Sequence, residues 1–299
     1  MRAISVFLFF AWFGAAPLAR AAQLPTAVLV VEEGDVVGQH LGRLVERRLQ
    51  GEVRIRWIVY SETELADSIY KGKFLATLQA ARLVVAIGDD SALLALAEVE
   101  ETPVYFVSSQ VPGSALAEGH VSGLLSYSAQ DALAAMPAAW KSGLDLLYSP
   151  GYEPAVEEIR AAAKAAGFDL IPRRVGRRRE LPAVVRTLLG SARAVWLLGD
   201  PMLSRGAGFE FLSEQTLSRS VPLVGAGFWE VKNGAVFCSR GRPEALARQA
   251  SRTIAGLMAG RPAQPRLELA EPGGSILYNK SLAAHFGLSP RPPVWQEIQ

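Results

Sequence analysis

Short apolar runs alternate with amphipathic stretches along the chain from residue 26 onward. Residues 27–31 (AVLVV) and 83–87 (LVVAI) are continuously apolar, which is typical of strands buried on both faces of a parallel sheet. Residues 53–60 (VRIRWIVY) also have strand character. Between these runs apolar residues recur at helical spacing, and Ser61 with Glu64 has the pattern of a capping box. The alternation predicts a parallel sheet with helices on both faces.

The same alternation begins again in the second half of the chain. The predicted strands there are residues 144–148, 168–171, 194–198, 222–224 and 235–238. The predicted helices are residues 129–139, 156–166, 181–189 and 209–218. Two such series in tandem predict an α/β fold of two Rossmann-like lobes, each with a parallel sheet, joined by a hinge.

The stretch between residues 102 and 128 connects the two halves. A second apolar run within it, residues 121–127, precedes a predicted helix start at Ser128, with Asp131 three residues later. We interpret this run as the passage of the chain from one lobe to the other. The predicted division is a leader of residues 1–22, a first lobe of residues 23–121 plus 242–262, and a second lobe of residues 122–241 plus 263–299 with the tail.

The C-terminal part of the chain continues with one more amphipathic helix. Residues 244–258 have helical spacing and are followed by Gly260 and Pro262, which end helices. The tail beyond residue 266 predicts one extended piece and a short helix at residues 281–286. The last ten residues include three prolines, and we expect them to lie along the surface.

The first residues have the pattern of a secretory signal peptide. Arg2 supplies the positive start, residues 6–16 form the apolar run, and Ala19-Arg20-Ala21 has the small-residue pattern of a cleavage site. The apolar run is shorter than the roughly 20 residues that span a bilayer. No cysteine lies near the cleavage site, so no lipid anchor is predicted. We expect a mature protein exported to the periplasm; an uncleaved membrane anchor is the alternative.

Composition narrows the classes of function. The formal net charge is +2, and the 31 basic residues nearly balance the 29 acidic ones, which gives no support for nucleic-acid binding. A single cysteine, Cys238, excludes an internal disulfide and lies in an apolar run typical of a buried residue. Three scattered histidines offer no metal-ligand spacing. We therefore expect no metal and no cofactor.

Motifs of common enzymes are also missing from the sequence. No G-x-S-x-G nucleophile turn occurs, and the short glycine pairs near residues 206 and 225 lack the third glycine of a dinucleotide fingerprint. Five arginines between residues 173 and 179 are typical of a solvated loop face. No acid and base pair stands at positions suited to catalysis, so the chain is not predicted to be an enzyme.

Polar residues follow the predicted strands of the first lobe at their carboxyl ends, where open α/β sheets bind ligands. Asp89 and Ser91 begin a predicted helix, whose free N–H groups attract anions, although either side chain of Asp89-Asp90 could simply cap that helix. Ser109 and Gln110 can both donate to a carboxylate and accept from an amine. Ser108 is a further candidate, with satisfaction of the strand-end backbone as its alternative role.

Candidates in the second lobe follow the same logic. Tyr152 lies after the strand at residues 144–148, and Asp200 ends a buried strand, where it could pair with a ligand ammonium group or serve as an ordinary turn residue. Phe228 and Trp229 follow the strand at residues 222–224, and their rings could stack on a cyclic ligand or belong to the core.

Four segments together resemble one known family. They are VVAIGDDSALLAL, TPVYFVSSQVPGSAL, LLGDPMLS and the near-terminal ILYNKSLAAHFGLSPRPP. In this order they resemble the type I periplasmic substrate-binding proteins of ABC transporters, and specifically the uncharacterised or aromatic-amino-acid-binding group. The resemblance extends over essentially all of the chain after the leader.

The resemblance implies two α/β lobes, joined by three crossovers, that close on a small molecule. It also implies a monomer that delivers an amino-acid-like solute to an ABC permease in the inner membrane, with no catalysis. The chain departs from the family at Gln110-Val111-Pro112, where an Asp-Pro pair is usual, and at residues 149–154. These departures motivate the alternative that the fold is a sensory or partner-docking module with a degenerate cleft.

Overall fold

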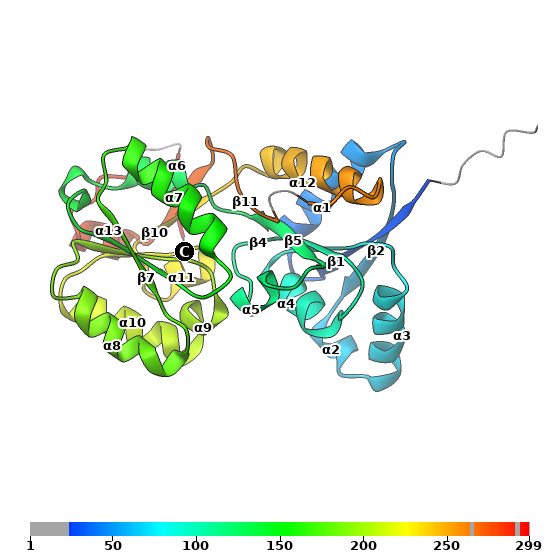
Figure 1. Ribbon diagram of the computed structural model, residues 1–299, viewed down its shortest axis with the longest axis horizontal. Coiled ribbons are helices and arrows are strands. Elements are labelled where there is room, and N and C mark those ends of the chain that lie inside the picture. Colours follow the sequence, from blue (N-terminus) through cyan, green and yellow to red (C-terminus); the bar gives the residue numbers. More distant parts are fainter. Residues whose placement is uncertain (1–23, 264–265, 291–293, 299) are drawn as a thin grey trace, which may run out of the picture.

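The computed structural model describes residues 24–263, 266–290 and 294–298. The predicted signal peptide, residues 1–22, lies outside the described residues. Within the described part, no helix is both long and apolar enough to cross a membrane. The chain forms two lobes that lie side by side (Figure 1).

The first lobe is built on a six-stranded sheet whose strands all pair in parallel. The order is β11-β5-β4-β3-β1-β2. Continuous apolar runs form β1, β3 and β4, which are buried on both faces as expected. The strands are β1 (Thr26–Glu32), β2 (Arg54–Tyr60), β3 (Val84–Ile87), β4 (Val104–Ser108), β5 (Val121–Leu125) and β11 (Leu267–Leu269).

Helices cover both faces of this sheet (Figure 1). On one face α1 (Val36–Leu49) and α12 (Pro243–Met258) pack on alternate residues of β1 such as Leu29. On the other face α3 (Ser68–Gln79) and α4 (Asp89–Glu98) pack on the remaining residues of that strand such as Val30. Two short helices, α2 (Glu62–Leu65) and α5 (Gly113–Leu116), lie in connections.

The second lobe has a seven-stranded sheet of order β13-β12-β10-β9-β8-β6-β7. Only the pairing of β10 with β12 is antiparallel among the described strands of this sheet. Its strands are β6 (Leu144–Tyr148), β7 (Leu170–Arg174), β8 (Ala194–Leu197), β9 (Leu223–Val224), β10 (Phe237–Arg240), β12 (Ser275–Tyr278) and β13 (Trp295–Glu297).

Helices again cover both faces of the second sheet. One face carries α6 (Ala129–Ala135), α7 (Glu153–Ala165) and α13 (Lys280–His285). The other carries α8 (Leu181–Leu188), α9 (Pro201–Ser204), α10 (Gly206–Ser218) and α11 (Phe228–Lys232), and the 3-10 turns are η1 (Ala138–Trp140) and η2 (Arg178–Glu180). The first five strands of each lobe follow the doubly wound order 2-1-3-4-5, so the prediction of two α/β lobes is confirmed.

Three crossings of the chain between the lobes lie next to one another and form the hinge. They are residues 126–128, 241–242 and 270–274. The Gly241 amide donates to the Ser126 carbonyl at 2.7 Å, and the Ala270 amide donates to the Leu125 carbonyl at 3.0 Å. Ser239 Oγ accepts from the Ser128 amide at 3.1 Å. Hydrogen bonds therefore connect the crossings to one another and to β10.

The structure corrects the predicted lobe boundaries in two places. Residues 122–125 belong to β5, and residues 267–269 form β11, and both strands lie in the sheet of the first lobe. The sequence placed both in the second lobe, because backbone pairing between distant strands leaves no local pattern. The strand predicted at residues 235–238 lies two residues later, and β13 adds to the edge of the second sheet, where a surface tail was expected.

Candidate functional site

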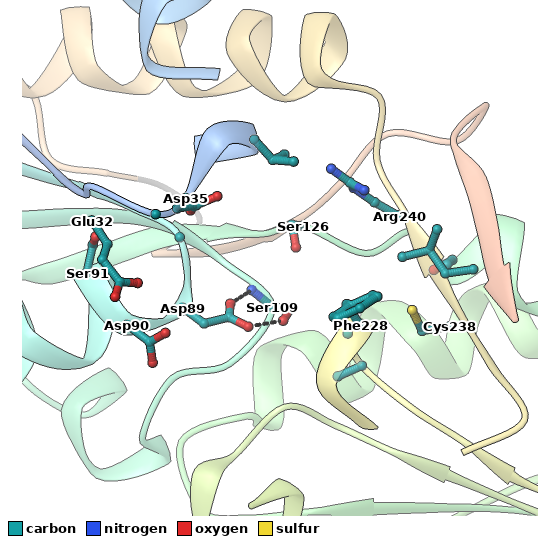
Figure 2. Close-up of a pocket in the computed structure, with 17 residues that line it drawn as sticks. Glu32, Asp35, Asp89, Asp90, Ser91, Ser109, Ser126, Phe228, Cys238 and Arg240 are labelled. Atoms are coloured by element: carbon teal, nitrogen blue, oxygen red, sulfur yellow. Dashed lines mark hydrogen bonds between the residues drawn. The ribbon is translucent and has the colours of Figure 1, made fainter. Parts of the chain in front are cut away.

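A cavity of about 510 Å³ lies between the two lobes, at the carboxyl ends of their strands. The loops after β1, β3 and β4 form its first-lobe wall, and the loop after β9 together with β10 forms its second-lobe wall. Ser126 of the hinge and Ser239 of β10 also line it. Figure 2 shows acidic side chains on one side of the cavity and Phe228, Cys238 and Arg240 on the other.

The first-lobe wall consists of two helix starts and their acidic residues. Asp35 caps α1 by accepting from the Gly38 amide at 2.8 Å. Gly88 precedes α4 with φ of 97°, a conformation that a side chain would strain. The Asp89 carboxylate accepts from the amide and hydroxyl of Ser109, both at 2.7 Å, and from the Ser108 hydroxyl at 2.7 Å. Asp89 is therefore fixed in place by the loop after β4.

Two further carboxylates of this wall differ in their partners. Asp90 accepts from Arg205 Nη1 of the second lobe at 3.0 Å. Within the described chain, Glu32 has no basic side chain at ion-pair distance. Partial burial, followed by the nearby charges of Asp90, Glu62 and Asp35, raises the pKa of Glu32. The wall thus holds an acid with uncompensated negative charge.

The second-lobe wall combines an exposed ring with a cation. Phe228 begins α11 and is 51% exposed although it is a large apolar side chain. Arg240 is the last residue of β10 and points into the cavity (Figure 2). No carboxylate among the described residues lies at ion-pair distance from Arg240. Buried Cys238 lies beside it, and burial raises the pKa of its thiol, which argues against a reactive thiolate.

Gln110 does not line the cavity and instead joins the lobes. Its side chain is fully buried, and Nε2 donates to Glu230 Oε1 of the second lobe at 2.7 Å. Its Oε1 accepts from Arg205 Nε at 2.5 Å. Both functional atoms of the amide are therefore used between the lobes.

Glu230, the partner of Gln110, is fully buried in α11. Its Oε2 accepts from the Gly227 amide at 2.9 Å. Burial is the largest cause that raises the pKa of Glu230 to about 7, and nearby Asp89 also raises it, while the hydrogen bonds from its own amide, Gly227 and Gln110 partly oppose the shift. The carboxyl group therefore titrates near neutral pH.

Tyr152 and Asp200 make a second set of contacts between the lobes. Asp200 Oδ2 accepts from the Gly113 amide at 2.7 Å and from the Ser149 hydroxyl, while Oδ1 caps α9. The Tyr152 hydroxyl lies 2.8 Å from the Val111 carbonyl oxygen and 2.7 Å from that of Gly199. We call the contacts of the loop at residues 110–113 with Tyr152, Gly199, Asp200, Arg205 and Glu230 the interlobe latch.

The predicted site residues therefore divide into two groups. Four of them line the cavity: Asp89, Ser91, Ser109 and Phe228. Five do not line it: Ser108, Gln110, Tyr152, Asp200 and Trp229. Trp229 lies on the opposite side of α11 from the cavity, where its ring packs edge-on against Phe209 with centroids 5.2 Å apart. Ser108 satisfies the strand-end backbone, its predicted alternative role.

The sequence-based prediction omitted Arg240 and Glu230 from the site. The loop at residues 32–34 was expected among the strand-end loops that supply ligand groups, although Glu32 itself was not selected. Arg240 also ends a buried strand, and that position could have marked it. No sequence signal marks Glu230, because its burial depends on contacts with a loop 120 residues away. In the described part of the chain, no group of three or more histidine, cysteine or acidic residues could hold a metal ion.

No family model matches the chain, and no curated protein matches it either. Solved structures do match. A protein from Streptococcus pneumoniae described as an ABC domain in complex with L-Trp has 19% identity and a TM-score of 0.52, covering 92% of this chain and 100% of that one. A conserved domain protein from Vibrio cholerae has 15% identity and a TM-score of 0.52, covering 92% of this chain and 99% of that one.

A third match is a substrate-binding protein with adhesive properties from Clostridium difficile, in its ligand-free, open structure. It has 15% identity and a TM-score of 0.51, and covers 92% of this chain and 99% of that one. None of the three is described as an enzyme. At these identities the likeness shows the fold, which is that of the type I periplasmic binding proteins, as the sequence resemblance implied.

Proposed function

We propose that the chain is an exported solute-binding protein that holds a small amino-acid-like molecule in the interlobe cavity. The observation that carries this proposal is the lining of the cavity, in which Glu32 lies on one wall and Arg240 lies with the exposed Phe228 ring on the other. Neither charged side chain has an ion-pair partner among the described residues. Exposed rings and charges that converge on one concave site are typical of ligand pockets. The similar structure in complex with L-Trp supports a ligand of this size.

The leader sequence and the fold extend the proposal to location and partner. The predicted signal peptide, residues 1–22, would export the chain to the periplasm, where it would act as a monomer. The partner would be an ABC permease in the inner membrane that receives the solute. No cofactor, catalysis or nucleic-acid partner belongs to this proposal.

A thermal-shift screen of the chain from residue 23 onward tests the proposal. Amino acids, nucleosides, sugars and small carboxylates are compared, since a ligand that binds only the folded state adds about 2.7 kcal/mol at a hundredfold excess over its dissociation constant. We expect a hit among amino-acid-like compounds that is weakened in Phe228→Ala. If a compound stabilises Phe228→Ala as much as the wild type, it binds outside the cavity, and this result contradicts the proposal.

The interlobe latch favours a second candidate function, a sensory or partner-docking module. Gln110, Tyr152 and Asp200 use their polar atoms between the lobes, so these residues hold the fold rather than a ligand. Such a protein would present a fixed surface to a membrane receptor. Pull-down from membranes with the wild type and with Arg240→Met distinguishes the two, because a docking module keeps its partner when the cavity is altered.

A further inference from the structure

The cavity carries opposite charges on its two walls, and Glu32 and Arg240 have no ion-pair partner in the part of the chain that the structure describes. On the first-lobe wall, the nearby charges that raise the pKa of Glu32 are all acidic, namely Asp90, Glu62 and Asp35, after the larger effect of burial. Arg240 of the second lobe stands on the opposite side of the cavity (Figure 2). Because a partly buried charge is costly without a partner, each wall favours a ligand group of opposite sign.

Apolar side chains also line the cavity. Phe228 contributes an exposed ring, and Val37 and Leu277 add aliphatic groups to the lining. A ligand that extends from one wall to the other can therefore place an uncharged stretch against these side chains. The cavity volume of about 510 Å³ is ample for an extended molecule of that size.

We infer that the cavity selects an elongated zwitterion, with a cationic group at Glu32 and Asp90, a carboxylate at Arg240, and an aliphatic stretch beside Phe228. The inference rests on the proposed function and specifies its substrate class. Basic amino acids and ω-amino acids belong to this class, because their charges stand at opposite ends of the molecule.

A neutral amino acid fits this arrangement less well. Its ammonium and carboxylate groups are bonded to the same carbon atom, whereas Glu32 and Arg240 lie on opposite sides of the cavity (Figure 2). Such a molecule held at one wall leaves the charge of the other wall unpaired in a cavity from which the ligand has displaced water. Asp90 already accepts a hydrogen bond from Arg205, so the binding of a ligand cation at the first-lobe wall depends mainly on Glu32.

Isothermal titration calorimetry with paired probes tests the inference. L-lysine is compared with L-norleucine, which has the same carbon chain without the terminal ammonium group. In the same way, 6-aminohexanoate is compared with hexanoate. We expect each charged probe to bind at least tenfold more tightly than its uncharged match, which is about 1.4 kcal/mol.

Two substitutions, each with a matched control, test which residues cause the preference for the charged probes. Glu32→Gln should abolish the preference for L-lysine over L-norleucine, while Glu33→Gln, an exposed neighbour outside the cavity lining, should keep it. Arg240→Met should weaken both amino acids at least tenfold, while Arg242→Met, also outside this cavity, should not.

Equal binding of L-lysine and L-norleucine overturns the inference, as does a preference that survives in Glu32→Gln. If L-tryptophan or another neutral amino acid binds most tightly and the binding is lost in Phe228→Ala, the proposed function stands and the inference fails. If none of the probes binds and the thermal-shift screen is also flat, the proposed function and the inference fail together.

Discussion

Glu230 is a carboxyl group buried where the two lobes meet, and it contacts both of them. It accepts from Gln110 Nε2 of the first lobe and from the Gly227 amide of its own helix start. An ionised carboxylate at such a place is costly, because the protein interior replaces water poorly. The protonation state of Glu230 therefore makes the contact between the lobes depend on pH.

Replacement of Glu230 by glutamine should reduce the pH dependence of stability. The folded pKa of about 7 lies above the ordinary value of 4.5, so the folded state binds the proton more tightly. This stabilisation is complete below pH 4.5 and is lost as the pH rises through 7. Relative to Glu230→Gln, the wild type should lose on the order of 2–3 kcal/mol of unfolding free energy over this range.

Urea unfolding at several pH values measures this difference. Glu210→Gln, a substitution of an exposed glutamate on α10, serves as the control and should follow the wild type. A parallel pH profile of Glu230→Gln and the wild type would show that the pKa of Glu230 is the same in the folded and unfolded states, and would contradict the assignment.

Phe228 is a second residue whose substitution tests the account, because its ring lines the cavity. Because the side chain is 51% exposed, Phe228→Ala should change the unfolding free energy by about 0.5 kcal/mol or less. Affinity for the ligand found in the screen should nevertheless fall about tenfold, since aromatic contact contributes on the order of 1 kcal/mol. Calorimetry measures the affinity. Ile69→Ala, which removes a 70% exposed side chain on α3, should leave it unchanged.

At the scale of the elements, close backbone approach joins the strand-end loops of the two lobes. A Cβ atom at Gly199, after β8, would overlap the Ser109 carbonyl oxygen of the loop after β4. A Cβ atom at Gly113, at the start of α5, would overlap the Pro150 carbonyl oxygen. A Cβ atom at Gly151, before α7, would overlap the Gly113 carbonyl oxygen. The glycines allow the main chains to meet, so that the Val111 amide donates to the Gly199 carbonyl at 2.8 Å.

Gly199→Ala should therefore separate these loops. The methyl group meets backbone rather than a flexible side chain, so we expect a loss of about 1–3 kcal/mol of unfolding free energy. Gly119→Ala is the control, because nothing lies within 4 Å of a Cβ atom there. Thermal unfolding of both variants measures the difference, and equal melting temperatures would contradict the close approach.

Local patterns in the sequence predicted the elements well but not the contacts between them. The capping box of Ser61 and Glu64 and the helix start at Ser128 are confirmed, because capping depends on residues three apart. By contrast, the pairing of β11 with β5 and the burial of Gln110 against Glu230 join segments more than a hundred residues apart. Such contacts are set by tertiary packing, which a single sequence does not display.

At the scale of the whole molecule, the lobes are joined at two separate places. The three crossings form the hinge on one side, and the interlobe latch closes the lobes on the other. Gln110, Tyr152 and Asp200 of the latch do not line the cavity. Contact between the lobes therefore depends mainly on residues outside the cavity lining, and the ion pair of Arg205 with Asp90 is the contact that also involves a lining residue.

Small-angle X-ray scattering tests whether the latch holds the lobes together without a ligand. The radius of gyration of the wild type should be the same within error with and without saturating ligand, while Gly199→Ala should have a larger radius than Gly119→Ala. A clear compaction of the wild type on ligand addition would show that the ligand, rather than the latch, closes the lobes.

The most direct measurement for the account as a whole is a crystal structure of the protein with the tightest-binding compound from the screen. The account predicts the ligand in the cavity between the lobes, in contact with Phe228 and with its carboxylate at Arg240, while the latch hydrogen bond between Gln110 and Glu230 is kept. A ligand bound elsewhere on the protein, with this cavity unchanged, would contradict it.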